Sequence, residues 1–127
     1  MKKLLYGILM LLAAACNTPS NQAAEPTILG EWDIHDTYEG KPWTLLARFK
    51  PDGTVDAMAN GKLVISQKFA VSGDTIYFSG DPNCGPNSVG AYKLTYFSDS
   101  LKINLIDDTC SVRIMNTDKV RFGRVKK

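Results

Sequence analysis

Three cysteines, one histidine and a pair of adjacent aspartates are the residues of this 127-residue chain that could carry chemistry. His35 is the single histidine, which removes metal sites built on several histidines and serine triads with a second supporting histidine. Asp107 and Asp108 are neighbours, and neighbours on a strand point to opposite faces, so we do not expect them to act as an acid and base pair. No glycine-rich phosphate motif precedes a helical pattern. The sequence therefore indicates a protein that is not an enzyme and that uses no metal or cofactor.

Cys16 follows a segment that is typical of an export signal. Lys2 and Lys3 form a positive start, residues 4–12 are apolar, and residues 13–15 are all alanine, as a signal peptidase requires. The apolar run is shorter than the roughly 20 residues needed to cross a bilayer, which disfavours an uncleaved membrane helix. We predict a signal peptide over 1–15.

The stretch Leu12-Ala13-Ala14-Ala15-Cys16 resembles the lipobox of bacterial lipoproteins. The resemblance implies that Cys16 is acylated, for example with palmitate, and binds the lipid membrane of the cell envelope. We expect the outer membrane, on its periplasmic or surface face. A plain secretory signal with an incidental cysteine is the alternative. Residues 17–26 are polar or small and lack apolar periodicity, which predicts a flexible tether over 16–27 and a folded domain over 28–127.

Composition and charge describe one ordinary globular domain. Hydrophobic residues make up 44% of the chain and charged residues 22%. The chain has 15 basic and 13 acidic residues, and removal of Lys2 and Lys3 with the signal peptide leaves 13 of each. A neutral domain without a basic stripe does not predict nucleic-acid binding. The locally basic C-terminal tail is interpreted as a solvated strand end; it holds Arg121, Arg124, Lys126 and Lys127.

The domain consists of short alternating segments divided by turn signals, and none of its stretches keeps a 3.6-residue apolar period. Asn60-Gly61 is the strongest signal, because a two-residue type I′ hairpin needs positive φ at both positions. The sequence predicts an all-β protein, an antiparallel up-and-down meander that closes into a small barrel of about eight strands. The candidate strands cover residues 29–37, 43–50, 54–59, 62–71, 75–79, 89–97, 101–106, 110–115 and 120–125.

Alternation along these segments separates an inner face from a wet face. The outer positions carry charges such as Arg48, Lys68 and Lys93. The predicted inner face comprises Trp43, Leu45, Ala47, Phe49, Leu63, Ile65, Gln67, Phe69, Val71, Ile76, Phe78, Tyr92, Leu94, Tyr96, Leu101, Ile103 and Leu105.

Cys84 and Cys110 remain once Cys16 is assigned to lipid, and an even pair in an exported domain predicts a disulfide. A metal site is the weaker alternative, because the two thiols have neither a CxxC spacing nor a nearby histidine. Cys84 lies in a connection over 80–88 that is rich in Gly and Pro.

Two pieces of the domain resemble bacterial lipocalin-like proteins. Gly30-Glu31-Trp32 is similar to the Gly-x-Trp that opens lipocalin barrels. The resemblance implies that Trp32 plugs the closed end beneath an arginine of the last strand, either Arg121 or Arg124. The longer piece runs through Cys84, 90–92, 99–101, Ile103, Leu105 and 107–113.

This longer piece resembles the disulfide-linked hairpins of small bacterial lipocalin-like proteins. It makes physical sense as two strands held by one bridge, with Arg113 near enough to pair with Asp107 or Asp108. The helix that follows the barrel in lipocalins and their Thr-Asp-Tyr are missing, which argues against a large ligand cavity.

Two functions follow from a barrel of this size, which can be filled or can hold a ligand. The first is a tethered barrel that binds a small apolar or amphipathic ligand through Trp43, Phe49, Phe69, Phe78, Tyr92 and Tyr96. The second is a structural or protein-interaction lipoprotein whose core is filled by those rings. Alanines at inner positions leave room and favour binding; they are Ala47, Ala57, Ala59 and Ala91. Arg113 could fix an acidic head group, although a structural pair with Asp108 is favoured.

Overall fold

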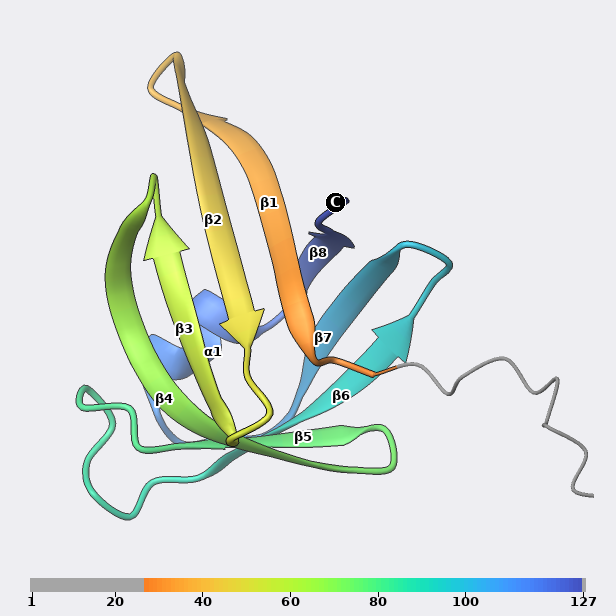
Figure 1. Cartoon of the computed structure of the whole chain (residues 1–127). Helices are drawn as coiled ribbons and strands as arrows, with labels where there is room; N and C mark the ends of the chain where they lie inside the picture. Colours follow the sequence, from red (N-terminus) through yellow and green to blue (C-terminus); the bar gives the residue numbers. More distant parts are fainter. Residues whose placement is uncertain (1–26, 127) are drawn as a thin grey trace, which may run out of the picture.

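The protein is described by a computed structural model over residues 27–126, which contain eight strands and one short helix (Figure 1). The predicted signal peptide, Cys16 and almost all of the predicted tether lie outside the described residues. The strands are β1 (Gly30–Tyr38), β2 (Lys41–Phe49), β3 (Thr54–Ala59), β4 (Lys62–Ser72), β5 (Thr75–Ser79), β6 (Gly90–Tyr96), β7 (Ser100–Asp107) and β8 (Val120–Arg124). The helix α1 (Ser111–Thr117) lies between β7 and β8.

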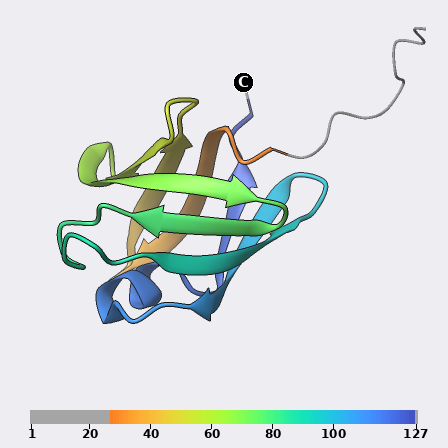
Figure 2. The ribbon, with the colours of Figure 1, turned by 90° about the horizontal axis from the view of Figure 1, so that it is seen from below.

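Each strand pairs antiparallel with the next, and the sheet closes on itself (Figure 2). Closure is made by β1, which pairs with β2 along its whole length and with β8 through Trp32–Arg124 and Asp33–Gly123. The predicted all-β, up-and-down barrel is therefore confirmed. The closing contact is short, because only Trp32 and Asp33 of β1 are paired with β8.

Two tight turns explain why the first four strands form hairpins. Asn60 and Gly61 have φ of 49° and 82°, the two positive values that a type I′ turn requires. Glu39 and Gly40 make the same kind of turn between β1 and β2, with φ of 50° and 76°. The second pair was not among the predicted turns, because Glu is an unusual residue at positive φ.

The predicted strand over 110–115 is wrong, because the chain forms α1 there. Ile114 N donates to Cys110 O at 3.0 Å and Asp118 N donates to Ile114 O at 2.9 Å, which are helical spacings. Asp108 turns the chain, since its Oδ1 accepts the Cys110 N–H at 2.9 Å. The turn brings Arg113 back onto the same carboxylate, which a straight strand could not do.

The predicted inner position of Leu63 is also wrong. The β3–β4 pairing slips between Ala57–Ile65 and Met58–Leu63, so β4 carries an extra residue and its side chains exchange faces beyond that bulge. Leu63 consequently lies in solvent with 62% of its surface exposed. Val71 and Leu105 were assigned to the interior as well, and both are exposed.

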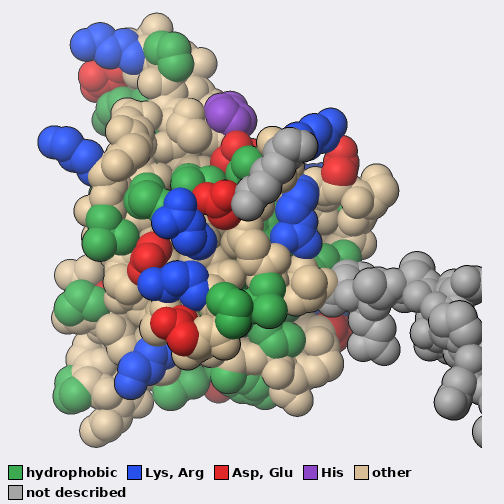
Figure 3. Space-filling view, viewed as in Figure 1, with side chains coloured by type: hydrophobic (Ala, Val, Ile, Leu, Met, Phe, Trp, Pro, Cys, Tyr) green, Lys and Arg blue, Asp and Glu red, His purple; other side chains and the backbone are tan. Residues whose placement is uncertain are grey.

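Buried apolar residues form one core inside the barrel, and charged residues lie on its outside. The core consists of Ile28, Trp32, Ala47, Phe49, Val55, Ile76, Phe78, Tyr92, Leu94, Leu101, Ile103 and Phe122. Side chains of both charges are interleaved on the face seen in Figure 3. Arg48 pairs with Glu31 across β1 and β2, and Lys50 pairs with Asp56. These pairs lie on the solvent-facing side of the strands that the alternation predicted.

The up-and-down order places alternate connections at opposite ends of the barrel. The hairpins β1–β2 and β3–β4, the β5–β6 loop over residues 80–89 and α1 share one end, which we call the mouth end. The start of β1, the end of β8 and the turns β2–β3, β4–β5 and β6–β7 share the other, which we call the plug end.

Candidate functional site

A cavity of about 420 Å³ lies inside the barrel and is lined mainly by apolar side chains. Four of the seven predicted ligand-binding residues line it: Trp43, Phe49, Phe78 and Arg113. Its wall also contains Ile34, Leu45, Ala47, Val55, Ala57, Ala59, Val64, Ile65, Gln67, Asp81, Ile103, Met115, Asn116, Thr117, Val120 and Phe122. Small alanines on β2 and β3 therefore leave the space that larger inner side chains would fill.

The other three predicted ligand-binding residues are not in the cavity wall. Phe69 packs edge-on against Phe49, with ring centroids 5.1 Å apart. Tyr96 lies near Trp32 at the plug end, with ring centroids 6.5 Å apart. Tyr92 is fully buried and its hydroxyl donates to Asp108. The alternation placed these rings on the inner face without showing which of them pack against neighbours and which border empty space.

Trp32 closes the plug end of the barrel. Its side chain is 2% exposed, and its indole Nε1 donates to Ile28 O at 2.8 Å. The guanidinium carbon of Arg124 lies 3.8 Å from the ring centroid, and its two terminal nitrogens donate to Leu29 O and Thr27 O at 2.8 Å. Arg124 thus occupies the position over Trp32 for which two arginines were considered. Arg121 instead lies over the Phe97 ring.

The mouth end is where the cavity meets solvent. Val64 and Met115 belong to the cavity wall, yet 59% and 77% of their surfaces are exposed. Val64 is the extra residue of the β4 bulge, and Met115 is on α1. The bulge and the helix therefore form two sides of an apolar entrance.

Arg113 is a buried charge whose partner is Asp108. Its Nε and Nη2 donate to the two carboxylate oxygens at 2.6 Å and 2.7 Å, and Nη2 also donates to Ser88 Oγ at 2.9 Å. The two side chains are 1% and 0% exposed. This bidentate arrangement is the strongest ion-pair geometry available to an arginine. Most of the hydrogen-bonding capacity of Arg113 is thus used within the protein.

Asp108 keeps its negative charge because of this environment. The Arg113 guanidinium, helped by the Tyr92 hydroxyl at 2.5 Å and the Cys110 N–H, lowers the pKa of Asp108 to about 2 despite burial. Burial, together with the hydrogen bond to Asp108, raises the pKa of Tyr92 well above its ordinary value. Tyr92 therefore stays neutral and donates, while Asp108 stays ionised and accepts.

Gly90 makes room for the ion pair. A Cβ at this position would collide with the Asp108 carboxylate and would lie 2.8 Å from Arg113 Nε. Gly90 begins β6, directly after the loop that carries Ser88. The absent side chain at Gly90 is therefore what allows Asp108 and Arg113 to lie against the strand.

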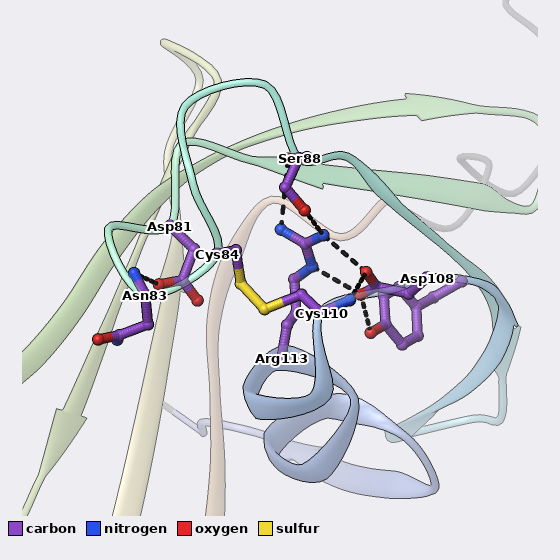
Figure 4. Close-up of a disulfide and its surroundings, with 8 residues drawn as sticks. Asp81, Asn83, Cys84, Ser88, Asp108, Cys110 and Arg113 are labelled. Atoms are coloured by element: carbon purple, nitrogen blue, oxygen red, sulfur yellow. Dashed lines mark hydrogen bonds and ion pairs between the residues drawn. A yellow bond between two sulfur atoms is a disulfide. The ribbon is translucent and has the colours of Figure 1, made fainter.

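The predicted disulfide between Cys84 and Cys110 is confirmed, with their Cα atoms 5.5 Å apart (Figure 4). It joins the β5–β6 loop to the residue that precedes α1. Ser88 of the same loop accepts hydrogen bonds from Arg113 of the helix. The loop and the helix, which border the mouth end, are thus held together by one covalent bond and one buried polar cluster.

Four polar residues of the cavity wall were not predicted as site residues, and two of them, Asp81 and Gln67, are largely buried. Asp81 is 3% exposed, and its Oδ1 accepts the Asn83 N–H at 2.8 Å (Figure 4). Gln67 points inward from β4, and its buried Oε1 has no hydrogen-bond partner within the described residues. The alternation had placed Gln67 among inner apolar residues, and a polar residue at such a position indicates a possible contact to a ligand. Asp81 follows Gly80 in an irregular loop, where sequence periodicity carries no information.

The single histidine lies outside the cavity. His35 is on β1, its side chain is 71% exposed, and its Nε2 lies 3.0 Å from Asp33 Oδ2. Its Nδ1 lies 3.3 Å from Thr44 Oγ1 on the neighbouring strand. Both contacts are on the outer surface of the barrel, so His35 takes no part in the candidate site.

No family model, curated protein or solved structure matches this chain. Among residues 27–126, no helix has both the length and the apolar character required to cross a membrane.

Proposed function

We propose that this protein is a cell-envelope lipoprotein whose barrel binds a small apolar or amphipathic ligand. The observation that carries the proposal is the cavity of about 420 Å³ between the Trp32 plug and the mouth end. Ligand pockets generally have volumes between about 300 and 1,000 Å³. The cavity is at the lower end of that range, which suits a molecule of modest size.

The cavity wall supports an apolar occupant. Trp43, Phe49 and Phe78 supply aromatic surface, and Ala47 and Ala57 keep the centre open. Burial of apolar ligand surface contributes about 25 cal/mol per Å², so a short alkyl or ring system gains affinity from this wall alone. A filled barrel used only for protein interaction would have larger side chains in place of these alanines.

The cavity walls are held at both ends of the barrel, which keeps the cavity open and supports ligand binding. The disulfide and the Asp108–Arg113 pair fix the loop and α1 at the mouth end, and the Trp32–Arg124 stack fixes the plug end. A preformed pocket loses little conformational entropy when a ligand enters. The proposed family is the lipocalin-like proteins, on the strength of Gly30-Glu31-Trp32 and the closed eight-strand meander.

Native mass spectrometry tests ligand binding directly. The protein is released from membranes in mild detergent, transferred to volatile buffer and compared with the Ala57→Phe variant, which fills the cavity. We expect the wild-type protein to retain a small molecule that the variant has lost. Identical spectra for the two proteins, with no additional mass after addition of lipid extract, would contradict the proposal.

The proposed membrane anchor rests on Leu12-Ala13-Ala14-Ala15-Cys16 and has its own test. The Cys16→Ser variant should leave the detergent phase and appear in the aqueous phase of a detergent partition experiment. Mass analysis of the wild-type N-terminal peptide should show added acyl chains. If Cys16→Ser partitions like the wild-type protein, the anchor proposal fails while the binding proposal stands.

A further inference from the structure

We propose that the cavity selects an amphipathic ligand whose head group is cationic, with Asp81 as its counter-ion and Gln67 as a second acceptor. This inference rests on the proposed binding function and names the chemical class of its ligand. The sequence had suggested an acidic head group held by Arg113, and the charges in the cavity wall argue for the opposite sign.

Two charged side chains line the cavity within the described residues, Arg113 and Asp81. The positive charge of Arg113 is balanced by Asp108, which contacts it through both carboxylate oxygens. Asp81 lies within 4.0 Å of no Lys, Arg or His nitrogen in the described chain, and its hydrogen bond to the Asn83 N–H is a bond to a neutral donor. The cavity therefore contains one uncompensated negative charge.

Burial makes that charge significant. Asp81 is 3% exposed, and its second carboxylate oxygen accepts no hydrogen bond from the described residues. A buried carboxylate is costly unless a cation or several donors accompany it, and one backbone N–H leaves most of its capacity unused. A ligand that brings an ammonium group to Asp81 would form a charge-assisted hydrogen bond, which is roughly twice as strong as a neutral one.

Gln67 favours a ligand whose head group has hydrogen-bond donors, which an ammonium group has. Its Oε1 is buried in the cavity wall and accepts no hydrogen bond from residues 27–126. Buried acceptors are nearly always satisfied in folded proteins. A ligand with N–H or O–H donors satisfies this acceptor, whereas a carboxylate has none to offer.

The apolar part of the cavity wall and the cavity volume determine the type and size of the ligand's tail. Apolar side chains surround the space, and its volume equals roughly 14 groups of the ~30 Å³ that one water molecule occupies in the liquid. A decyl chain with a small head group has a size that fits. The predicted ligand is therefore a short alkyl or aromatic amine rather than a fatty acid.

Isothermal titration with three matched probes tests the inference. Decylamine, decanol and decanoate share one chain and differ in the charge of the head group. Each is added below its aggregation threshold to the exported Cys16→Ser protein at neutral pH. We expect decylamine to bind at least about tenfold more tightly than decanol, the factor that one charge-assisted hydrogen bond supplies, and decanoate to bind most weakly.

Two variants assign the preference to residues. Asp81→Asn keeps an oxygen for the Asn83 N–H and should remove the amine preference without changing the affinity for decanol by more than about twofold. Asp74→Asn removes the same charge from the β4–β5 turn at the plug end and should leave all three affinities unchanged. Gln67→Leu should weaken decylamine and decanol together while raising the melting temperature, because it removes a buried acceptor without a partner.

The outcomes separate this inference from the proposed function. If none of the three probes binds, the binding function itself is contradicted. If the probes bind and decanoate equals or exceeds decylamine, or if Asp81→Asn preserves the amine preference at wild-type melting temperature, the cationic ligand is ruled out and the binding function remains.

Discussion

Asp108 accepts two parallel hydrogen bonds from Arg113 five residues later, and the chain between them turns into α1 in a stretch with strand-like sequence. Arg113 is itself part of the cavity wall, and the pair lies between the helix and the β5–β6 loop. It therefore holds the mouth end in shape, and its chemistry determines how the barrel responds to acid and to substitution.

Replacing Asp108 by Asn should destabilise the protein by about 3 to 5 kcal/mol at pH 7, because Arg113 would remain buried without a counter-charge. The pKa of Asp108 falls from 3.8 to about 2 on folding, so the stabilisation is complete above pH 4 and is lost as the pH falls through 4 to 2. Urea titrations across this pH range measure both effects. Asp107→Asn removes an exposed carboxylate next to it and is the control. Equal acid sensitivity of Asp108→Asn and wild type would contradict this prediction.

The substitution Gly90→Ala should destabilise the protein by about 1 to 3 kcal/mol, the usual range for an overpacked site. The added methyl group would overlap Asp108 and press on Arg113. Gly123→Ala in β8 is the matched control, since the nearest atoms to its added Cβ are 3.9 Å away. Thermal denaturation of both variants checks the prediction. A Gly90→Ala protein as stable as Gly123→Ala would show that the ion pair is placed differently.

Removal of the plug tryptophan should have a large effect on stability. Trp32→Ala is expected to cost about 3 to 5 kcal/mol, the range for a buried large aromatic. Trp43→Ala provides the comparison, because Trp43 is only half-buried and borders the cavity, and its loss should cost clearly less. Chemical denaturation monitored by far-UV circular dichroism gives both values. A Trp32→Ala cost below about 1 kcal/mol would mean that this end of the barrel is closed by other residues.

Replacing Cys84 and Cys110 together by Ser should lower stability by roughly 2 to 4 kcal/mol and leave the circular dichroism spectrum unchanged, because the bridge acts mainly on the unfolded chain. Peptide mapping of exported protein without reductant should show one Cys84–Cys110 bond. Free thiols at these positions in the exported protein would show that the disulfide does not form. An altered spectrum in the double variant would show that the disulfide also shapes the folded state.

Much of the fold could be predicted because strand pairing follows local rules. Alternation identified the eight strands, and Asn60-Gly61 identified a hairpin from the two positive φ values it supports. The bulge at Val64 could not be predicted, since an extra residue changes no composition and only exchanges faces. The helix escaped prediction as well: α1 has seven residues, too few to show a period, and its N-cap Cys110 makes no side-chain cap hydrogen bond.

The candidate site was predicted less completely than the fold. Trp43, Phe49 and Phe78 could be found because inner positions follow from alternation. Tyr92 was correctly placed on the inner face, but the sequence could not show that its hydroxyl donates to Asp108, because that contact depends on the three-dimensional placement of Asp108. Asp81 could not be found at all, because it lies in an irregular loop where alternation does not indicate which side chains are buried.

Titration of decanol and decylamine into Ala57→Phe and Ala70→Phe is the measurement that tests the binding cavity most directly. Ala57 lines the cavity, whereas Ala70 is exposed on the outer side of β4, so both variants add one ring and only the first fills the space. We expect wild type and Ala70→Phe to bind with equal affinity and Ala57→Phe to bind at least about tenfold more weakly, a loss of about 1.4 kcal/mol. Equal binding by all three proteins, or binding by none of them, would contradict a ligand site inside the barrel.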